Sequence, residues 1–218
     1  MGNRKVSLEN GEFYHIYNRG VDKRIIFKTK ADMDRFFESM QTFNTTEPAG
    51  SILEQRLIKN KNQSKNKKAT PLVKFVSYCL LPNHFHFILE QIVDGGISEF
   101  MKRLSGGFTS YFNKMHDRSG ALFQGVFKST HLDTNEYLLY ASAYVNLNHR
   151  QKDQFGGFTP KLVKSSWEEF LGNSDDDFCK GKGIVLDQFT NRKEAEKFAL
   201  DVLESVRENK QKYKDLEE

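Results

Sequence analysis

Two histidines separated by one phenylalanine form the stretch best suited to chemistry. His84 and His86 lie inside an apolar run, and side chains alternate between the two faces of a strand. Both imidazoles are therefore expected on one face, while Phe85, Phe87 and Leu89 point into a core on the other. Two imidazoles on a rigid strand can bind a divalent metal ion. On spacing alone, histidines that face solvent or hydrogen-bonded partners are at least as good an interpretation.

A tyrosine and an asparagine further along the chain extend this chemistry. Tyr144 and Asn148 are one helical turn apart and so share a helix face. A tyrosine is a poor nucleophile at neutral pH, because its ordinary pKa is ~10. It needs a nearby metal ion or an electrophile that the metal has polarised. An amide oxygen from Asn148 would complete a His-His-Asn site, which suits Mg²⁺ or Mn²⁺ bridging to a phosphate.

Other residues compete for these roles. Tyr140, Tyr137 and Tyr111 are alternative nucleophiles, and Tyr140 lies one turn before Tyr144 on the same expected helix. Asn146 is an alternative ligand, but it faces away from Tyr144. For Asn148 itself, the alternative role is that of a helix C-terminal cap.

The bulk composition favours one domain with additions. The chain has 218 residues, a formal net charge of +4 and a pI near 8.9, which permits a nucleic-acid partner without requiring one. Its two cysteines have no C-x-x-C spacing, so we expect reduced thiols and a cytoplasmic location. We expect no signal peptide, and no apolar stretch approaches the ~20 residues that a membrane span requires.

Hydrophobic periodicity gives an order of elements that can position the site. The second predicted helix contains the pair Gly106 and Gly107, which suggests a kink or the close approach of another backbone. The order is strand 13–20, helix 31–43, strand 73–81, the histidine strand after a turn at 82–83, helix 97–116, strand 122–129 and helix 137–148. This β-α-β-β-α-β-α order predicts an α+β fold. It has a ferredoxin-like antiparallel sheet with helices on one face, the tyrosine helix after the last strand, and the other face open for a ligand.

Composition also divides the chain. Residues 1–150 are predicted to form the main domain, with a Lys- and Asn-rich insertion near 44–70 that includes a polar loop at 59–68. Residues 151–218 are predicted to form a mostly helical extension, with a packed turn or short helix at 164–171 and an amphipathic helix at 191–216.

The ordered motifs resemble the HUH-type single-tyrosine transposases, and within them the REP-associated tyrosine transposases. The resemblance runs from about residue 13 to about residue 150. It rests on residues 14–20 (YHIYNRG), 81–86 (LPNHFH), 120–125 (GALFQG), 127–129 (FKS) and 144–148 (YVNLN). The chain departs from the family pattern at His149, where the family often has Pro, and at Val126, where it often has Arg.

The resemblance implies a role for each residue of the site. His84, His86 and Asn148 would hold one divalent cation, Mg²⁺ or Mn²⁺, which polarises the scissile phosphate of single-stranded DNA. Tyr144 would attack that phosphate and form a 5′-phosphotyrosine link, and a second strand would then rejoin the DNA. The DNA itself would be contacted by polar and basic side chains, namely Asn18, Arg19, Lys23, Arg24, Arg103, Gln124 and Lys128.

Three functions remain open at this point. The first is a transposase or recombinase acting on single-stranded or hairpin DNA. The second is a relaxase-like nickase with the same metal chemistry, and the third is a domesticated protein that binds hairpin nucleic acid without cutting it. We expect a monomer or homodimer without a membrane partner, in the cytoplasm of a prokaryote and associated with its nucleoid.

Overall fold

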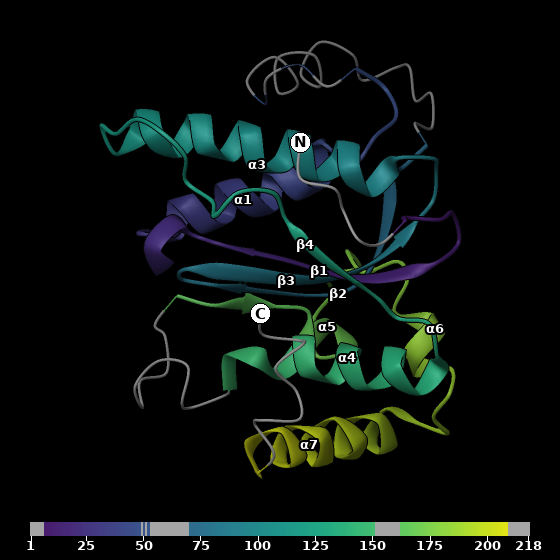
Figure 1. Ribbon diagram of the computed structural model, residues 1–218. Helices are drawn as coiled ribbons and strands as arrows, with labels where there is room; N and C mark the ends of the chain where they lie inside the picture. The colour runs from purple at the N-terminus through teal and green to yellow at the C-terminus, as the bar shows by residue number, and fades with distance from the viewer. Residues whose placement is uncertain (1–6, 49, 51, 53–69, 151–161, 209–218) are drawn as a thin grey trace.

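A five-stranded antiparallel sheet separates two layers of helices (Figure 1). The computed structural model describes residues 7–48, 50, 52, 70–150 and 162–208. Most of the Lys- and Asn-rich insertion, including the polar loop predicted at 59–68, lies outside the described residues.

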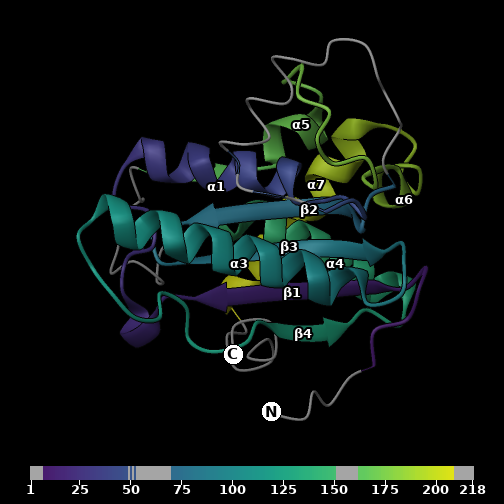
Figure 2. The ribbon, with the colours of Figure 1, turned by 90° about the horizontal axis from the view of Figure 1, so that it is seen from above.

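The strand order confirms the predicted fold class. The sheet runs β4-β1-β3-β2-β5, and its first four strands have the ferredoxin-like order (Figure 2). The turn at Pro82 and Asn83 joins β2 to β3, as predicted. The strands are β1 Phe13–Arg19, β2 Val73–Leu81, β3 His84–Gln91, β4 Lys128–His131 and β5 Lys164–Ser165.

Two helices cover one face of the sheet, α1 Lys30–Thr42 and α3 Gly96–Met115. The first begins at a capping box, because Thr29 accepts from the backbone of Asp32 and the Asp32 side chain accepts from that of Thr29. The apolar faces of both helices pack against Phe85, Phe87 and Leu89 of β3 in one core. The assignment of these three side chains to the core face is therefore confirmed.

The opposite face is not open, so that part of the expectation was wrong. A second core lies between the sheet and the helices after β4, and it contains Tyr144, Trp167 and Val202 (Figure 1). The sequence could not indicate this cover, because an apolar helix does not reveal which sheet face it will bury. The elements are α4 Asn135–Leu147, the short η2 Asn148–Arg150, α5 Trp167–Leu171, α6 Gly183–Leu186 and α7 Arg192–Glu208. The last predicted helix is thus confirmed to residue 208, and its remainder lies outside the described residues.

The strand predicted at 122–129 is mostly a loop, because β4 begins only at Lys128. Leu122 and Phe123 are consecutive and both buried, which does not fit the alternation of a strand. Gly125 has a φ of +72°, which turns the chain before β4 begins. The loop is held to the end of β1 by a hydrogen bond from Gln124 N to the Arg19 carbonyl (2.8 Å).

The expected kink at Gly106 and Gly107 is also absent. Helix α3 continues without a break from Gly96 to Met115. Gly107 instead accommodates the ring of Phe43, since a Cβ there would lie 2.8 Å from Phe43 Cε2. The close neighbour is therefore a side chain and not another backbone.

The C-terminal extension is joined to the sheet and to α4. Strand β5 pairs with β2, which adds a fifth strand that the sequence did not predict. Ser166 Oγ donates to Asn146 Oδ1 (2.6 Å) and accepts from Tyr78 N (2.8 Å), and both Ser166 and Asn146 are buried. The domain boundary at residue 150 stays a prediction.

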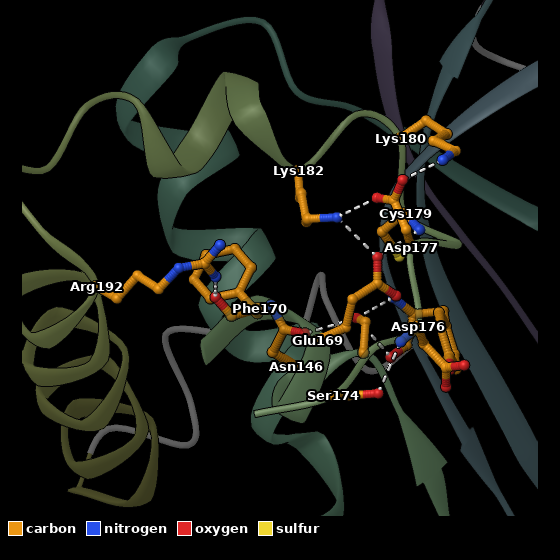
Figure 3. Close-up of polar contacts among 12 residues, drawn as sticks. Asn146, Glu169, Phe170, Ser174, Asp176, Asp177, Cys179, Lys180, Lys182 and Arg192 are labelled. Atoms are coloured by element: carbon orange, nitrogen blue, oxygen red, sulfur yellow. Dashed lines mark hydrogen bonds and ion pairs between the residues drawn. The ribbon is translucent and has the colours of Figure 1, made fainter. Parts of the chain in front are cut away.

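Within the extension, one lysine joins two acidic residues. Lys182 Nζ donates to Glu169 Oε1 (3.0 Å) and to Asp177 Oδ1 (2.7 Å) (Figure 3). Glu169 is buried, and its Oε1 also accepts from Cys179 N (2.8 Å). These contacts hold the loop after α5 to that helix. Both cysteines, Cys79 and Cys179, are free thiols.

None of the helices in the described segments combines the length and the apolar character that a membrane crossing requires.

Candidate functional site

A pocket of about 290 Å³ lies where the ends of β1 and β3 meet α4 and the loop before β4. The antiparallel register places Tyr17 opposite His86 and Arg19 opposite His84. Side chains of directly opposed residues project from the same face, so the two strands supply one continuous wall. The lining residues are Tyr17, Asn18, Arg19, Lys23, Asn83, His84, His86, Gln124, Lys128 and Tyr144.

The two histidines of β3 share a face, as predicted. Their ring centroids are 5.1 Å apart and the rings are nearly perpendicular, at 85°. The Nδ1 atom of His84 lies 2.6 Å from Asn83 Oδ1. Because a carboxamide oxygen only accepts, Nδ1 of His84 carries the proton and Nε2 is the acceptor nitrogen.

The other histidine of the pair has a different partner. His86 Nδ1 lies 2.9 Å from Nε2 of His15, on the neighbouring strand β1. The two rings are almost parallel, with 9° between their planes and centroids 5.1 Å apart. Burial lowers the pKa of His15 to about 3, and burial together with His84 and His15 lowers the pKa of His86 well below its usual value. Both imidazoles are therefore neutral at neutral pH, the form that binds metal ions.

The predicted nucleophile lies against this histidine cluster. Tyr144 comes from α4, and its ring meets His86 edge-on with centroids 5.9 Å apart and 84° between the planes. It makes a similar contact with His15 at 6.3 Å. Tyr144 is only 2% exposed and still forms part of the pocket wall, so a substrate has to enter the pocket to meet it. The rival tyrosines Tyr140, Tyr137 and Tyr111 are not among the lining residues.

The predicted third ligand is buried and is not part of the pocket wall. Asn148 is fully buried at the end of α4, and neither Oδ1 nor Nδ2 of its amide has a hydrogen-bond partner among the described residues. Asn148 does not line the pocket. Asn146 does not line the pocket either, and its amide oxygen accepts from Ser166 Oγ.

Polar and basic side chains form the rim. Arg19 Nε donates to Gln124 Oε1 (2.6 Å), and Asn18 Nδ2 donates to the Gly125 carbonyl (3.3 Å). The Lys128 ammonium lies 5.8 Å from the centre of the Tyr17 ring. These contacts place fixed positive charge next to the histidines, which suits an anionic ligand such as a phosphate.

Two of the predicted DNA contacts are placed elsewhere. Arg24 donates to the Val21 carbonyl (3.0 Å) and pairs with Asp22 in the turn η1 Val21–Lys23. Arg103 lies on α3, where it pairs with Glu99 and donates to the carbonyls of Thr45 and Glu47. Neither arginine lines the pocket, so their assignment to DNA stays a prediction.

Three residues of this site were not singled out from the sequence. Tyr17 and Asn83 line the pocket, and His15 lies directly behind His86. The alternation along residues 13–20 puts His15, Tyr17 and Arg19 on one face, which is the available signal. The register between β1 and β3 decides which partner each of them meets, and that register is a tertiary feature.

Part of the predicted ligand set, His84 and His86, has the chemistry to bind a divalent cation. His84 and His86 each have Nδ1 hydrogen-bonded, which leaves Nε2 as the candidate ligand atom, the usual arrangement of metal-binding histidines. An unpaired, buried amide costs about 1–3 kcal/mol, and ligation through Oδ1 of Asn148 would offset that cost. Within the described ranges, no group of three or more His, Cys, Asp or Glu side chains is arranged to hold a metal ion.

Comparison with known proteins gives a likeness in structure and none in sequence. Neither the protein-family models nor the curated proteins compared with this chain match its sequence. Among solved structures, the chain is similar to a REP-associated tyrosine transposase bound to a REP hairpin. The identity is 9%, the TM-score is 0.47, and the match covers 82% of this chain and 90% of the other. A likeness of this size carries no conclusion about activity.

Proposed function

We propose that this protein cleaves and rejoins single-stranded DNA through a covalent phosphotyrosine link. The observation that carries the proposal is the shared pocket of Tyr144, His84 and His86, with Arg19 and Lys128 at its rim. The tyrosine and the histidines are far apart in the sequence. A phenol beside two neutral imidazoles and fixed positive charge is suited to attack on a phosphodiester.

Each step of the proposed reaction breaks one bond from phosphorus to oxygen and forms another. The Tyr144 hydroxyl loses its proton and its oxygen attacks the phosphorus, while the bond from phosphorus to the 3′ oxygen breaks. The 3′ oxygen takes up a proton, and the 5′ phosphate stays on the tyrosine. In the second step the 3′ hydroxyl of another strand attacks the same phosphorus, and the phenol leaves and regains its proton. No nucleotide cofactor is required.

A divalent cation, Mg²⁺ or Mn²⁺, would be held by His84 and His86, with Asn148 as the proposed third ligand. When bound, it would polarise the scissile phosphate and stabilise charge on its oxygens. Arg19 and Lys128 would hold the flanking phosphates. The half-buried ring of Tyr17 stacks on that of His86, with centroids 5.7 Å apart, and would help to keep this imidazole in place.

A covalent-adduct assay tests the proposal. The protein is incubated with end-labelled single-stranded DNA containing a hairpin, in the presence of Mg²⁺ or Mn²⁺, and separated on a denaturing gel. We expect a protein-linked DNA band that disappears with a chelator and in Tyr144→Phe. The substitution removes only the hydroxyl oxygen, so the helix and its packing are retained.

Two matched variants control the assay. Tyr140→Phe makes the same change one turn earlier on α4, outside the pocket, and should leave the band unchanged. Tyr17→Phe tests the other tyrosine of the pocket. A band that survives in Tyr144→Phe and is lost in Tyr17→Phe would transfer the nucleophile to β1. Nicking without joining would favour a nickase.

The buried position of Tyr144 favours a second candidate function, that of a hairpin-binding protein without cleavage. In that case the basic rim would hold DNA while the phenol stays unreacted. Binding of labelled hairpin in a native gel, together with no covalent band under any cation, would support this function and contradict the first.

A further inference from the structure

We propose that His15 is a positioning residue for the cation site: it accepts the Nδ1 proton of His86 and so directs the Nε2 lone pair of His86 toward the pocket. The inference rests on the proposed function and adds a residue of β1 to its machinery. His15 itself does not line the pocket.

One hydrogen bond joins the two rings, so a single proton lies between them. His15 Nε2 and His86 Nδ1 are 2.9 Å apart, and both rings are buried, at 0% and 3% exposure. Two neutral imidazoles can make one N–H···N hydrogen bond, in which one ring donates and the other accepts. The identity of the donor therefore fixes the tautomer of both rings.

Only one of the two arrangements permits a ligand role for His86. If His15 donates, His86 carries its proton on Nε2, and that atom has no lone pair for a cation. If His86 donates, its Nε2 lone pair is available and His15 carries its proton on Nδ1. The rings thus have both protons on Nε2 or both on Nδ1, and cation binding selects the second state.

The surroundings of His15 make the state with both protons on Nδ1 the less favourable one. His15 Nδ1 is buried without a hydrogen-bond partner among the described residues. A buried N–H without an acceptor is less favourable than a buried lone pair without a donor. The pair should therefore hold its protons on Nε2 before a cation binds and on Nδ1 afterwards. His84 differs, because the Asn83 oxygen fixes its tautomer in advance.

Nuclear magnetic resonance of ¹⁵N-histidine-labelled protein reads these tautomers directly. His15 and His86 signals are assigned with single substitutions, and spectra are recorded without DNA, with a chelator and then with saturating Mg²⁺. We expect both rings to change from the Nε2–H to the Nδ1–H form together. Rings that keep their protons on Nε2 while Mg²⁺ is bound would overturn the inference.

Cation affinity provides the second readout, measured with Mn²⁺ alone by electron paramagnetic resonance. His15→Phe removes the acceptor and should weaken Mn²⁺ binding about 10- to 100-fold. His15→Gln keeps a side-chain oxygen that can accept, and should restore most of the affinity. His131→Phe makes the matched change on β4, where the imidazole bonds Glu12 outside the pocket, and should have no effect.

The outcomes separate this inference from the function on which it rests. Equal Mn²⁺ affinity in the unaltered protein and in a folded His15→Phe variant would overturn the role of His15 alone. A protein that binds no Mn²⁺ at all would overturn the cation site of the proposed function, and the role of His15 with it. Thermal unfolding of each variant establishes that it is folded.

Discussion

At the scale of single residues, burial gives the histidine pair a measurable effect on stability. The pKa of His15 falls to about 3 because the ring is removed from water. In the unfolded chain the imidazole takes up a proton below its ordinary pKa of about 6.5. Between these two values the unfolded state binds more protons than the folded state, so stability decreases as the pH falls through this window.

We expect the free energy of unfolding to decrease by about 1.4 kcal/mol for each pH unit below 6.5 from His15 alone. His15→Gln removes this titration, so at pH 5 about 2 kcal/mol of the loss seen in the unaltered protein should be absent from the variant. Urea unfolding at pH 7 and pH 5, in the presence of a chelator, measures the difference.

If His15→Gln retains the full pH dependence of the unaltered protein, then His15 takes up its proton in the folded state and the account of its burial is wrong.

At the scale of elements, the two glycines of α3 differ in what surrounds them. A Cβ at Gly106 would meet nothing within 4 Å, whereas one at Gly107 would lie 2.8 Å from Phe43. Glycine in a helix interior costs about 0.5–1 kcal/mol relative to alanine. The sequence alone suggested the same role for both residues, and only packing distinguishes them.

Alanine substitutions at these two positions should therefore have opposite effects. Gly106→Ala should raise the free energy of unfolding by about 0.5–1 kcal/mol, because it adds helix propensity without a clash. Gly107→Ala should lower it by about 1 kcal/mol or more, because the Phe43 ring must move. Chemical unfolding of the two variants side by side checks this, and equal gains in both would contradict the close packing of Phe43.

At the scale of the whole molecule, the extension fixes the helix that carries the tyrosine. Helix α4 lies between the sheet and α7, and the Ser166 hydroxyl links Asn146 of α4 to Tyr78 of β2 (Figure 1). Tyr144 thus reaches the pocket of its own chain on a helix that is held by β2 and by the extension.

We expect Ser166→Ala to lower the free energy of unfolding by about 1–3 kcal/mol, because it leaves the buried oxygen of Asn146 without its donor. Ser110→Ala on the exposed side of α3 is the matched control and should change stability by less than about 0.5 kcal/mol. Thermal and urea unfolding measure both. An unchanged stability in Ser166→Ala would show that α4 is held by apolar packing alone.

Periodicity and motifs were enough to predict most of the local structure and most residues of the pocket. Alternation placed His84 and His86 on one face and Phe85 on the other, because a strand has a period of two. The order of the predicted elements was sufficient to predict the ferredoxin-like fold class. The motifs also pointed to Tyr144 and to the rim residues Arg19 and Lys128, which the structure brings together.

Only the tertiary structure decided which side chains meet across elements. The register of β1 against β3 places His15 behind His86, and neither strand encodes that pairing alone. Tertiary packing also decided that helices cover the second face of the sheet. It likewise decided that most of the strand predicted at 122–129 is a loop. Apolar residues show that they will be buried, but the partner that buries them depends on how distant elements fit together.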